Sequence, residues 1–306
     1  MVSINYTFLG GEAVVREWGK KGTSSDITIY DKKESDVVRT WTLPTGFPDK
    51  IQPLFQAIQL GEYVIFYVTK LDKFTGEQII ALDVLGKDKG LLCHSYDVDR
   101  SQLSTMIKGT IVEKYKLVEA GDLKKEMESL PAVSKDGDAK VVIDHAFEVK
   151  GVGVVLLGKV ECGRIKTYDN VKLLPSGKDV MIKSIQMHDD DVKEAAAPAR
   201  VGLAVKGVNA DDVQRGDVLC NSGNVKVSQE IVLDYKQNRY FKEDVKEGQT
   251  FVVNVEMQMK TAKIVSLNPM KLQFMKPVAF ELGDVAVVLR PESQGVRIAG
   301  SGRIIN

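Results

Sequence analysis

The sequence lacks a net charge, because its 42 lysine and arginine side chains balance 42 aspartates and glutamates. An overall electrostatic attraction for nucleic acid is therefore excluded, although a neutral total is compatible with a basic patch on one face. The sequence also lacks an apolar run of the roughly 20 residues that a membrane-spanning helix needs. Its first residues lack the charged and apolar segments of a signal peptide. We therefore expect a cytoplasmic protein with no membrane partner and no DNA partner.

Cysteine and histidine are scarce. Cys93, Cys162 and Cys220 are odd in number and far apart, which gives neither a disulfide framework nor the spacing of metal ligands. We expect three buried free thiols in a reducing compartment and no metal site. His188 lies among the acidic residues 189–191, where a solvated loop is a better interpretation than a metal centre.

The length of 306 residues predicts two or three domains. A hydrophobic fraction of 43% is ample for globular cores. The stretch 129–140 is polar and contains Pro131 and Gly137, which is typical of a linker. A weaker break falls near 221–225. The predicted units are a first domain at 1–130, a linker at 131–139, and two further domains at 140–224 and 225–306.

The first unit alternates β-favouring and helical patterns, which indicates a parallel α/β sheet. The predicted strands are 2–10, 25–31, 38–43, 63–71 and 90–97, and the predicted helices are 49–61, 76–87, 101–109 and 121–130.

The second and third units show short β-favouring runs separated by turn signals, a rhythm typical of β-barrels. The most informative stretch, at 143–163, reads IDHAFEVKGVGVVLLGKVECG and predicts a strand, a turn and a second strand. Glycines within such a pattern indicate a bulge, a tight corner or a close approach of another group. Asp144 and His145 stand just before the first strand, where side chains can face a ligand.

The stretch 143–163 resembles the start of the second domain in elongation factor Tu-like translational GTPases. It is most similar to the SelB-like, selenocysteine-specific factors of archaea, where an Asp-His-Ala-Phe run leads into Lys-Gly-x-Gly and a hydrophobic strand. Within that family it resembles the SelB-like factors of methanogens that are linked to pyrrolysine.

The resemblance continues through 159–195 and through 199–220, which carries the family's Arg-Gly-Asp run at 215–217. Residues 225–306 resemble the third domain. The first ~130 residues match the family only in their layout. The resemblance implies a degenerate Ras-like P-loop GTPase-type domain followed by two elongation factor Tu-like β-barrels.

The first domain lacks a P-loop, whose Gly-x-x-x-x-Gly-Lys-[Ser/Thr] pattern wraps the phosphates and binds Mg²⁺. Gly10 and Gly11 stand where the loop should open, but Glu12 follows, and a carboxylate there would repel phosphate. The lysine-rich stretch 19–24 has the wrong spacing, so we interpret it as a polar turn before a strand. About 16 residues separate the first two strands, too few for a P-loop, its helix and a switch region.

The other two nucleotide motifs are also altered. The family's Asp-x-x-Gly-His becomes Leu43 to Phe47, with only Gly46 kept, so the metal and catalytic positions are lost. The guanine-reading pattern [Asn/Thr]-Lys-x-Asp occurs at 69–72, one strand too early, and we interpret it as a chance match. The expected place lacks the lysine and retains aspartates at 97 and 99. We therefore predict no catalytic residue, no GTP hydrolysis, little or no GTP binding and no cofactor, with GTP and Mg²⁺ bound only if this altered site still functions. The altered nucleotide-site positions are Gly10, Gly11, Leu43, Gly46, Phe47, Asp97 and Asp99.

The resemblance implies a pocket on the second domain for the aminoacyl end of a tRNA. His145 and Arg200 fall where SelB-like factors carry cations that cradle a selenolate. Asp144 could pair with either cation or meet an α-amino group. The alternative is a plain turn with solvated side chains. The candidate pocket residues are Asp144, His145, Phe147, Leu157 and Arg200.

Contacts to the tRNA backbone would come from basic residues of the second and third domains. Arg297 and Arg303 follow an alternating pattern, so we expect both to face one side of a strand. Solvent-facing side chains of a barrel are the alternative. The candidates are Lys263, Lys271, Lys276, Arg290, Arg297 and Arg303.

The expected function is that of a SelB-like elongation factor paralogue whose nucleotide switch is lost. Its expected partners are aminoacyl-tRNA, including specialised ones such as pyrrolysyl-tRNA, or the ribosome, with other translation proteins in addition. The sequence offers no domain for docking an mRNA hairpin after the third unit. Two alternatives stay open: a divergent but active GTPase, and a protein-interaction module whose first domain docks a partner.

Overall fold

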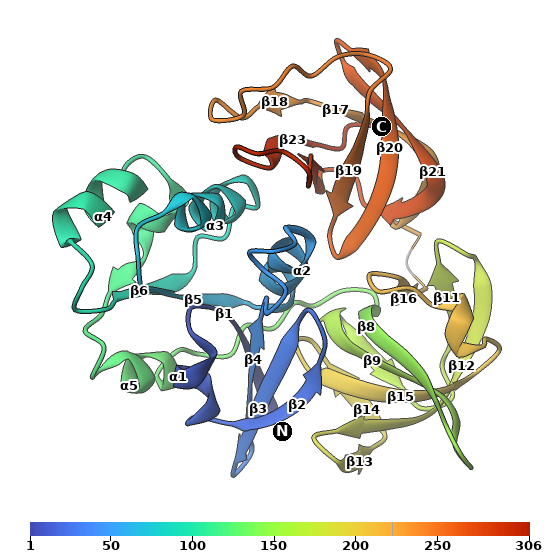
Figure 1. Cartoon of the computed structure of the whole chain (residues 1–306). Coiled ribbons are helices and arrows are strands. Elements are labelled where there is room, and N and C mark those ends of the chain that lie inside the picture. Colours follow the sequence, from blue (N-terminus) through green and yellow to red (C-terminus); the bar gives the residue numbers. More distant parts are fainter. Residues whose placement is uncertain (222) are drawn as a thin grey trace.

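The computed structural model describes residues 1–221 and 223–306. It contains an α/β domain followed by two all-β domains, which lie at the three corners of the molecule in Figure 1. The predicted fold class is confirmed. Among the described residues, no helix combines the length and apolar character needed to cross a membrane.

The first domain is built on a seven-stranded sheet in the order β2-β3-β4-β1-β5-β6-β7. Strands β4, β1, β5, β6 and β7 run parallel, whereas β2 and β3 are antiparallel to their neighbours. The strands are β1 Val2–Leu9, β2 Lys20–Ser24, β3 Thr28–Glu34, β4 Val37–Leu43, β5 Tyr63–Val68, β6 Gly90–His94 and β7 Lys116–Leu117.

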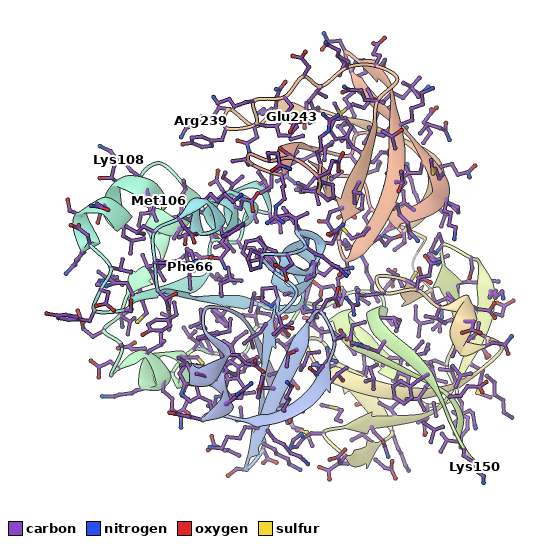
Figure 2. All side chains as sticks on the ribbon, in the orientation of Figure 1. Phe66, Met106, Lys108, Lys150, Arg239 and Glu243 are labelled. Carbon is purple, nitrogen blue, oxygen red and sulfur yellow. The ribbon has the colours of Figure 1, made fainter. Side chains whose placement is uncertain are left out.

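Helices cover both faces of this sheet, because its parallel strands are apolar on both sides. Figure 2 shows Phe66 of β5 enclosed in the interior, on the face that also buries Leu54 and Ile79, while Trp41 and Met127 belong to the core on the other face. The helices are α1 Glu12–Arg16, α2 Gln52–Leu60, α3 Lys73–Val84, α4 Arg100–Ile107 and α5 Leu123–Glu128, with a 3₁₀ turn at Ile111–Lys114.

The predicted strands and helices of this domain are present, with ends that differ by a few residues. One prediction is wrong: the stretch 19–24 is not a turn, because 20–24 form strand β2 at the edge of the sheet, paired with β3. Four of its five residues are exposed. An exposed polar edge strand has no hydrophobic alternation, so the sequence carries no strand signal there.

The second domain is a barrel in the order β11-β16-β8-β9-β15-β12-β13, closed by a further pairing of β11 with β12. The predicted glycine corner is present, since Gly151 and Gly153 have φ values of +83° and +99° between β8 and β9. The strands are β8 Lys140–Val149, β9 Gly153–Cys162, β10 Arg164–Lys166, β11 Asn170–Leu174, β12 Lys178–Met187, β13 Asp190–Val192, β14 Glu194–Ala196, β15 Arg200–Lys206 and β16 Val218–Cys220.

The third domain is a seven-stranded antiparallel sheet in the order β17-β21-β20-β19-β22-β23-β18. A bridge between Leu233 and Ile304 joins its two ends. The strands are β17 Lys226–Leu233, β18 Lys236–Gln237, β19 Thr250–Val255, β20 Gln258–Leu267, β21 Met270–Phe280, β22 Val285–Leu289 and β23 Ile298–Arg303.

The three domains share apolar cores. Val287 and Leu289 of the third domain pack into the core beneath α2 and α3 of the first. A further cluster joins Leu60, Val142 and Met257, one from each domain. None of the three cysteines forms a disulfide; Cys93 and Cys220 are buried, whereas Cys162 is only partly buried, contrary to expectation.

Candidate ligand-binding cleft between the first two domains

A bulge in β8 creates the polar centre of the second domain. The pairing of β8 with β9 shifts between Ile143 and His145, so Asp144 is the extra residue. Arg200 lies on β15, which is separated from β8 by β9, and it donates to the Asp144 carboxylate from Nη1 at 2.7 Å and from Nη2 at 3.2 Å. The ring nitrogen Nδ1 of His145 lies 2.7 Å from the same carboxylate. The fold thus joins three of the candidate pocket residues in one cluster.

Asp144 is the anionic anchor of this cluster, and only 3% of it is exposed. Burial alone would raise its pKa, but the charge of Arg200 and the hydrogen bonds from His145 and Arg200 outweigh burial and lower the pKa below its ordinary value. The carboxylate is therefore ionised at neutral pH. It orients the Arg200 guanidinium, whose side chain keeps 17% of its surface exposed.

A cleft of about 440 Å³ opens beside this cluster, between the two domains. Its wall in the second domain includes Leu157 and Arg200, which come from the adjacent strands β9 and β15. Its wall in the first domain includes Lys20 and Lys21 of β2. The cleft therefore combines an apolar surface with three cations and with the carboxylates of Asp31 and Asp189. The cations outnumber the carboxylates, so the cleft can accept a ligand with an anionic part.

Of the five candidate pocket residues, two line the cleft, whereas Asp144, His145 and Phe147 do not. Leu157 and Arg200 line the cleft, while Asp144 lies behind Arg200 with both carboxylate oxygens engaged. The expectation that Asp144 could meet an α-amino group is therefore contradicted, because the carboxylate is buried and already paired. Phe147 lies farther along β8, opposite Val155 and 40% exposed, and is not among the lining residues.

Several lining residues escaped the sequence interpretation. The sequence predicts a turn for Lys20 and Lys21 and a solvated loop for His188. His188 lies in the turn between β12 and β13, and it also lines the cleft, 3.7 Å from Asp31 of the first domain. Beside it, Lys33 pairs with Asp190. The two lysines within 19–24 indicate a basic segment. They do not indicate that this segment faces the second domain across a cleft.

Arg215, in the Arg-Gly-Asp run, bridges the second domain to the first. Its Nη1 donates to Asp26 at 2.7 Å and to Gln56 at 3.2 Å, and its Nη2 donates to Ser25 at 3.0 Å. Its Nε donates to the backbone carbonyl of Asp144 at 3.4 Å. This run therefore organises the domain boundary next to the cleft.

Positions 10–12 follow β1, where a P-loop would begin. A Cβ on Gly10 would lie 2.9 Å from the side chains of Phe8 and Tyr67. Gly11 is the N-cap of α1, a helix of five residues. The Glu12 carboxylate accepts a hydrogen bond from the Tyr30 hydroxyl at 2.5 Å, and it forms an ion pair with the Lys21 ammonium at 3.3 Å.

The second altered motif lies after β4. Leu43 is buried in the core of the first domain, and Gly46 donates its backbone N–H to the carbonyl of Asp26 at 2.7 Å. The Phe47 ring contacts Phe74 edge to face at a centroid distance of 6.0 Å. These three positions thus serve packing.

The third motif places its aspartates at helix starts. Asp72 caps α3 by accepting from the backbone N–H groups of Phe74 and Thr75, which gives the 69–72 pattern a structural role. Asp99 caps α4 in the same way, and Asp97 is exposed after β6.

The tRNA-backbone candidates include one clear error. Arg297 is buried at the boundary of the first and third domains, where its Nη2 lies 2.6 Å from the Glu77 carboxylate and its guanidinium lies over the Phe47 ring. It precedes β23, whereas Arg303 at the end of β23 is exposed, so the two do not face one side.

The remaining basic candidates differ in exposure and in whether they pair with a carboxylate. Arg290 lies over the Phe251 ring and pairs with Glu243, and Lys271 pairs with Glu230. The exposed candidates are Lys263, Lys276 and Arg303. Among the described residues, no group of three or more His, Cys, Asp or Glu side chains is arranged to hold a metal ion.

Comparisons with known proteins match this architecture. The family model "Elongation factor Tu domain 2" matches residues 153–220. The fold matches crystal structures of the elongation factor SelB from Methanococcus maripaludis, with a TM-score of 0.83 for the complex with a GTP analogue and 0.78 for the apo form. The first match covers 100% of this chain and 79% of that chain at 20% identity. The protein therefore has the three-domain fold of elongation factor Tu-like translation factors.

Sequence relatives place it within that class. An uncharacterized protein of Methanocaldococcus jannaschii is 36% identical over 96% of both chains. The selenocysteine-specific elongation factor of the same organism is 28% identical, over 62% of this chain and 46% of its own length. The chain belongs to the SelB-like family of translation factors, and it spans less than half of that selenocysteine factor.

Proposed function

We propose that this protein binds the aminoacyl end of an aminoacyl-tRNA in the cleft between its first two domains, without a GTP switch. The observation that carries the proposal is the cleft wall formed by Leu157 and Arg200, with Arg200 held by the buried Asp144. An aminoacyl end presents an amino acid side chain next to an anionic nucleotide backbone. An apolar wall beside cations suits both parts.

The loss of the GTP switch is supported by the altered nucleotide positions. The apolar Leu43 offers no oxygen for Mg²⁺, which binds through carboxylates, phosphates and water. The five-residue helix α1 begins with Glu12, whose carboxylate is paired. Asp72 and Asp99 are engaged as helix caps. The residues at these positions therefore do not fit GTP and Mg²⁺.

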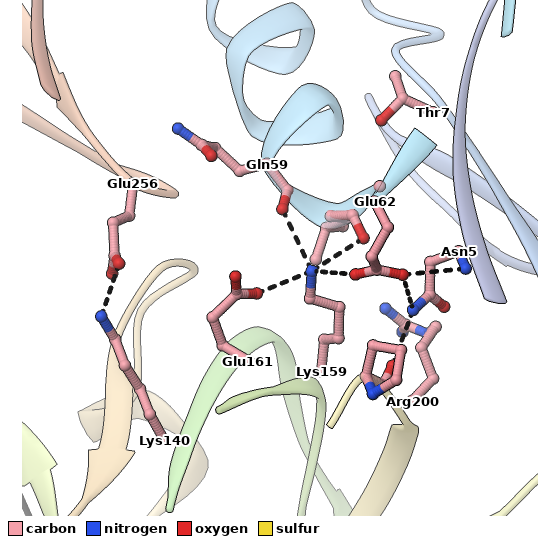
Figure 3. Close-up of polar contacts among 12 residues, drawn as sticks. Asn5, Thr7, Gln59, Glu62, Lys140, Lys159, Glu161, Arg200 and Glu256 are labelled. Atoms are coloured by element: carbon pink, nitrogen blue, oxygen red, sulfur yellow. Dashed lines mark hydrogen bonds and ion pairs between the residues drawn. The ribbon is translucent and has the colours of Figure 1, made fainter. Parts of the chain in front are cut away.

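The arrangement of the domains supports a cleft that stays assembled without nucleotide. Figure 3 shows the Lys159 ammonium of the second domain surrounded by acceptors, with Glu62 of the first domain at 2.9 Å and Glu161 at 2.7 Å. Lys140 reaches Glu256 of the third domain at 2.6 Å. Separating the domains would expose the apolar clusters that they share, while the ion pairs specify which surfaces meet.

The proposal is tested by crosslinking the protein to RNA in its host and sequencing the bound RNA. We expect enrichment of one or a few tRNAs, with specialised ones such as pyrrolysyl-tRNA as a named candidate. An RNA profile equal to that of an unrelated control protein would refute tRNA binding. Pull-downs before and after nuclease treatment separate this result from a protein-docking role.

A binding assay tests the cleft itself. Arg200→Glu should weaken binding of a charged tRNA more than binding of the same tRNA without its amino acid. Because Arg200→Glu leaves Asp144 without its partner, Leu157→Glu provides a second change of the wall that leaves the ion pair intact. Arg164→Glu, at an exposed arginine of the same barrel, is the matched control and should bind like the unmodified protein.

The alternative of an active GTPase is tested by titration with a fluorescent GTP analogue and Mg²⁺. We expect no saturable binding in the micromolar range and no phosphate release. Micromolar affinity that depends on Mg²⁺ would overturn the loss of the switch while leaving tRNA binding open to its own test.

A further inference from the structure

Arg215 lies outside the cleft but contacts both of its walls. It is not among the lining residues, and its side chain retains 22% of its surface exposed. Its contacts reach the first domain at Asp26 and Ser25, and the second domain at the Asp144 carbonyl. One guanidinium therefore joins the two elements on which the cleft depends.

The turn that carries Arg215 is fixed to the bulge of β8. Gly216, with φ of +91°, donates its N–H to the Ile143 carbonyl at 2.7 Å, and Ile143 donates back to the Asp217 carbonyl at 2.9 Å. The Asp217 carboxylate accepts from the backbone of Gln214 at 2.8 Å. A side chain on Gly216 would lie 2.6 Å from the Gln258 backbone nitrogen of the third domain. The turn is thus held in one place from two sides.

Two of the first-domain acceptors of Arg215 are adjacent in sequence to β2, the strand that forms part of the cleft wall. Ser25 and Asp26 form the connection between β2 and β3, and β2 carries Lys20 and Lys21. Gln56 lies on α2 and donates in turn to the Met257 carbonyl of the third domain at 3.0 Å. Arg215 therefore contacts the β2–β3 connection and α2 at the same time.

We propose that Arg215 is a positioning residue that sets the separation of the two cleft walls and the orientation of the Asp144–Arg200–His145 cluster. It acts from behind the cleft and touches no ligand. A planar guanidinium with several donors in a fixed fork can hold acceptors on two domains at once, which a lysine ammonium on a flexible stem cannot do equally well. The proposal rests on the proposed function only for the identity of the ligand.

The test begins with a readout that needs no ligand. The chain has three histidines: His145 is in the cluster, His188 lines the cleft and His94 lies at the end of β6 in the first domain. In Arg215→Met we expect the imidazole NMR resonances of His145 and His188 to shift while those of His94 stay in place. A role in stability alone would lower the melting temperature and leave all three sets unchanged in the folded protein.

The second readout is binding of an aminoacyl-tRNA. We expect Arg215→Met to weaken it by roughly fivefold or more, the size of a typical coupling between sites. The affinity of Arg215→Lys should lie between those of the unmodified protein and Arg215→Met. The control Arg164→Met should bind with the affinity of the unmodified protein. If Arg215→Met does not fold, Asp26→Asn removes the charged acceptor alone and should still shift His188.

The outcomes separate the two proposals. If the unmodified protein binds no aminoacyl-tRNA but the histidine shifts occur, the proposed function fails and the positioning role stands. If the unmodified protein binds and the folded Arg215→Met variant binds equally, with unshifted His145 and His188, the positioning role is refuted.

Discussion

At the scale of single residues, this protein relies on buried charges that are paired. Asp144 with Arg200, and Glu77 with Arg297, are ion pairs in which at least one partner is almost completely buried. Such pairs add little net stability when intact, because desolvation offsets the attraction. Removing one partner is costly, since it leaves the other charge buried. They therefore specify which strands and domains meet.

Asp144→Asn should destabilise the protein by about 3 to 5 kcal/mol at pH 7, because it leaves Arg200 without its counter-charge. The pKa of Asp144 is lowered from 3.8, so its stabilising contribution is complete above that value and is lost as pH falls through the lowered folded-state pKa. Urea unfolding at neutral and acidic pH measures both effects. The variant should lose less stability on acidification than the unmodified protein. Asp179→Asn, at a largely exposed carboxylate, should change little; equal losses in both variants would contradict the prediction.

Glu77→Gln should cost about 3 to 5 kcal/mol, because Arg297 then remains buried at the boundary of two domains. The combined change Glu77→Leu with Arg297→Met should recover much of this loss, since no charge is then left buried. Glu243→Gln breaks the more exposed pair with Arg290 and should cost clearly less. Chemical unfolding of the four proteins measures the differences. A combined variant no more stable than Glu77→Gln would show that the charge is not the cause.

At the scale of elements, the edge strand β2 supplies most of the first-domain wall of the cleft. It occupies the stretch where the family resemblance would place the parts of a nucleotide switch, and it pairs with β3 through Lys20, Lys21 and Ser24. Its polar side chains leave it without a hydrophobic face of its own. Its position therefore depends on backbone pairing and on the close packing of Gly19.

Gly19→Ala should displace β2 from the sheet. The added Cβ would lie 2.7 Å from the Asp31 carbonyl oxygen and 2.8 Å from the Trp41 ring, and overpacking of this kind costs about 1 to 3 kcal/mol. Gly22→Ala, within β2, is the matched control because the nearest neighbour of its added Cβ would be 3.5 Å away. Hydrogen exchange of β2 amides should speed up in the first variant only. Equal exchange in both would show that Gly19 does not hold the strand.

At the scale of the whole molecule, the three domains share cores and therefore support one another. Leu289 and Ile298 of the third domain belong to the same apolar cluster as Leu54 and Ile79 of the first. Domains joined in this way are expected to unfold together rather than one by one.

Leu289→Ala should destabilise the protein by about 2 to 5 kcal/mol, as expected for a buried leucine. It should also reduce the hydrogen-exchange protection of α2 and α3 in the first domain. Ile231→Ala, inside the core of the third domain, is the comparison and should affect those helices less. Calorimetry should show a single transition for the unmodified protein. Unchanged protection of α2 and α3 in Leu289→Ala would indicate that the domains are independent.

The sequence by itself determined the order of the main strands and helices of the first domain, the α/β and barrel classes and, through its motifs, the resemblance to the family. These depend on periodicity, turn residues and the local motif around Asp144 and His145, which neighbouring residues along the chain define. The strand β2 was missed because a polar edge strand has no such periodicity.

Only the tertiary structure decided which charges face a ligand and which face another domain. Arg297 and Arg303 are arginines of the same C-terminal segment, yet Arg297 is buried against Glu77 and Arg303 is exposed. Arg215 and Asp26 are 189 positions apart but form an ion pair. The physical reason is that burial and pairing of a side chain depend on which surfaces the folded domains bring together, and no local pattern encodes contacts over such distances.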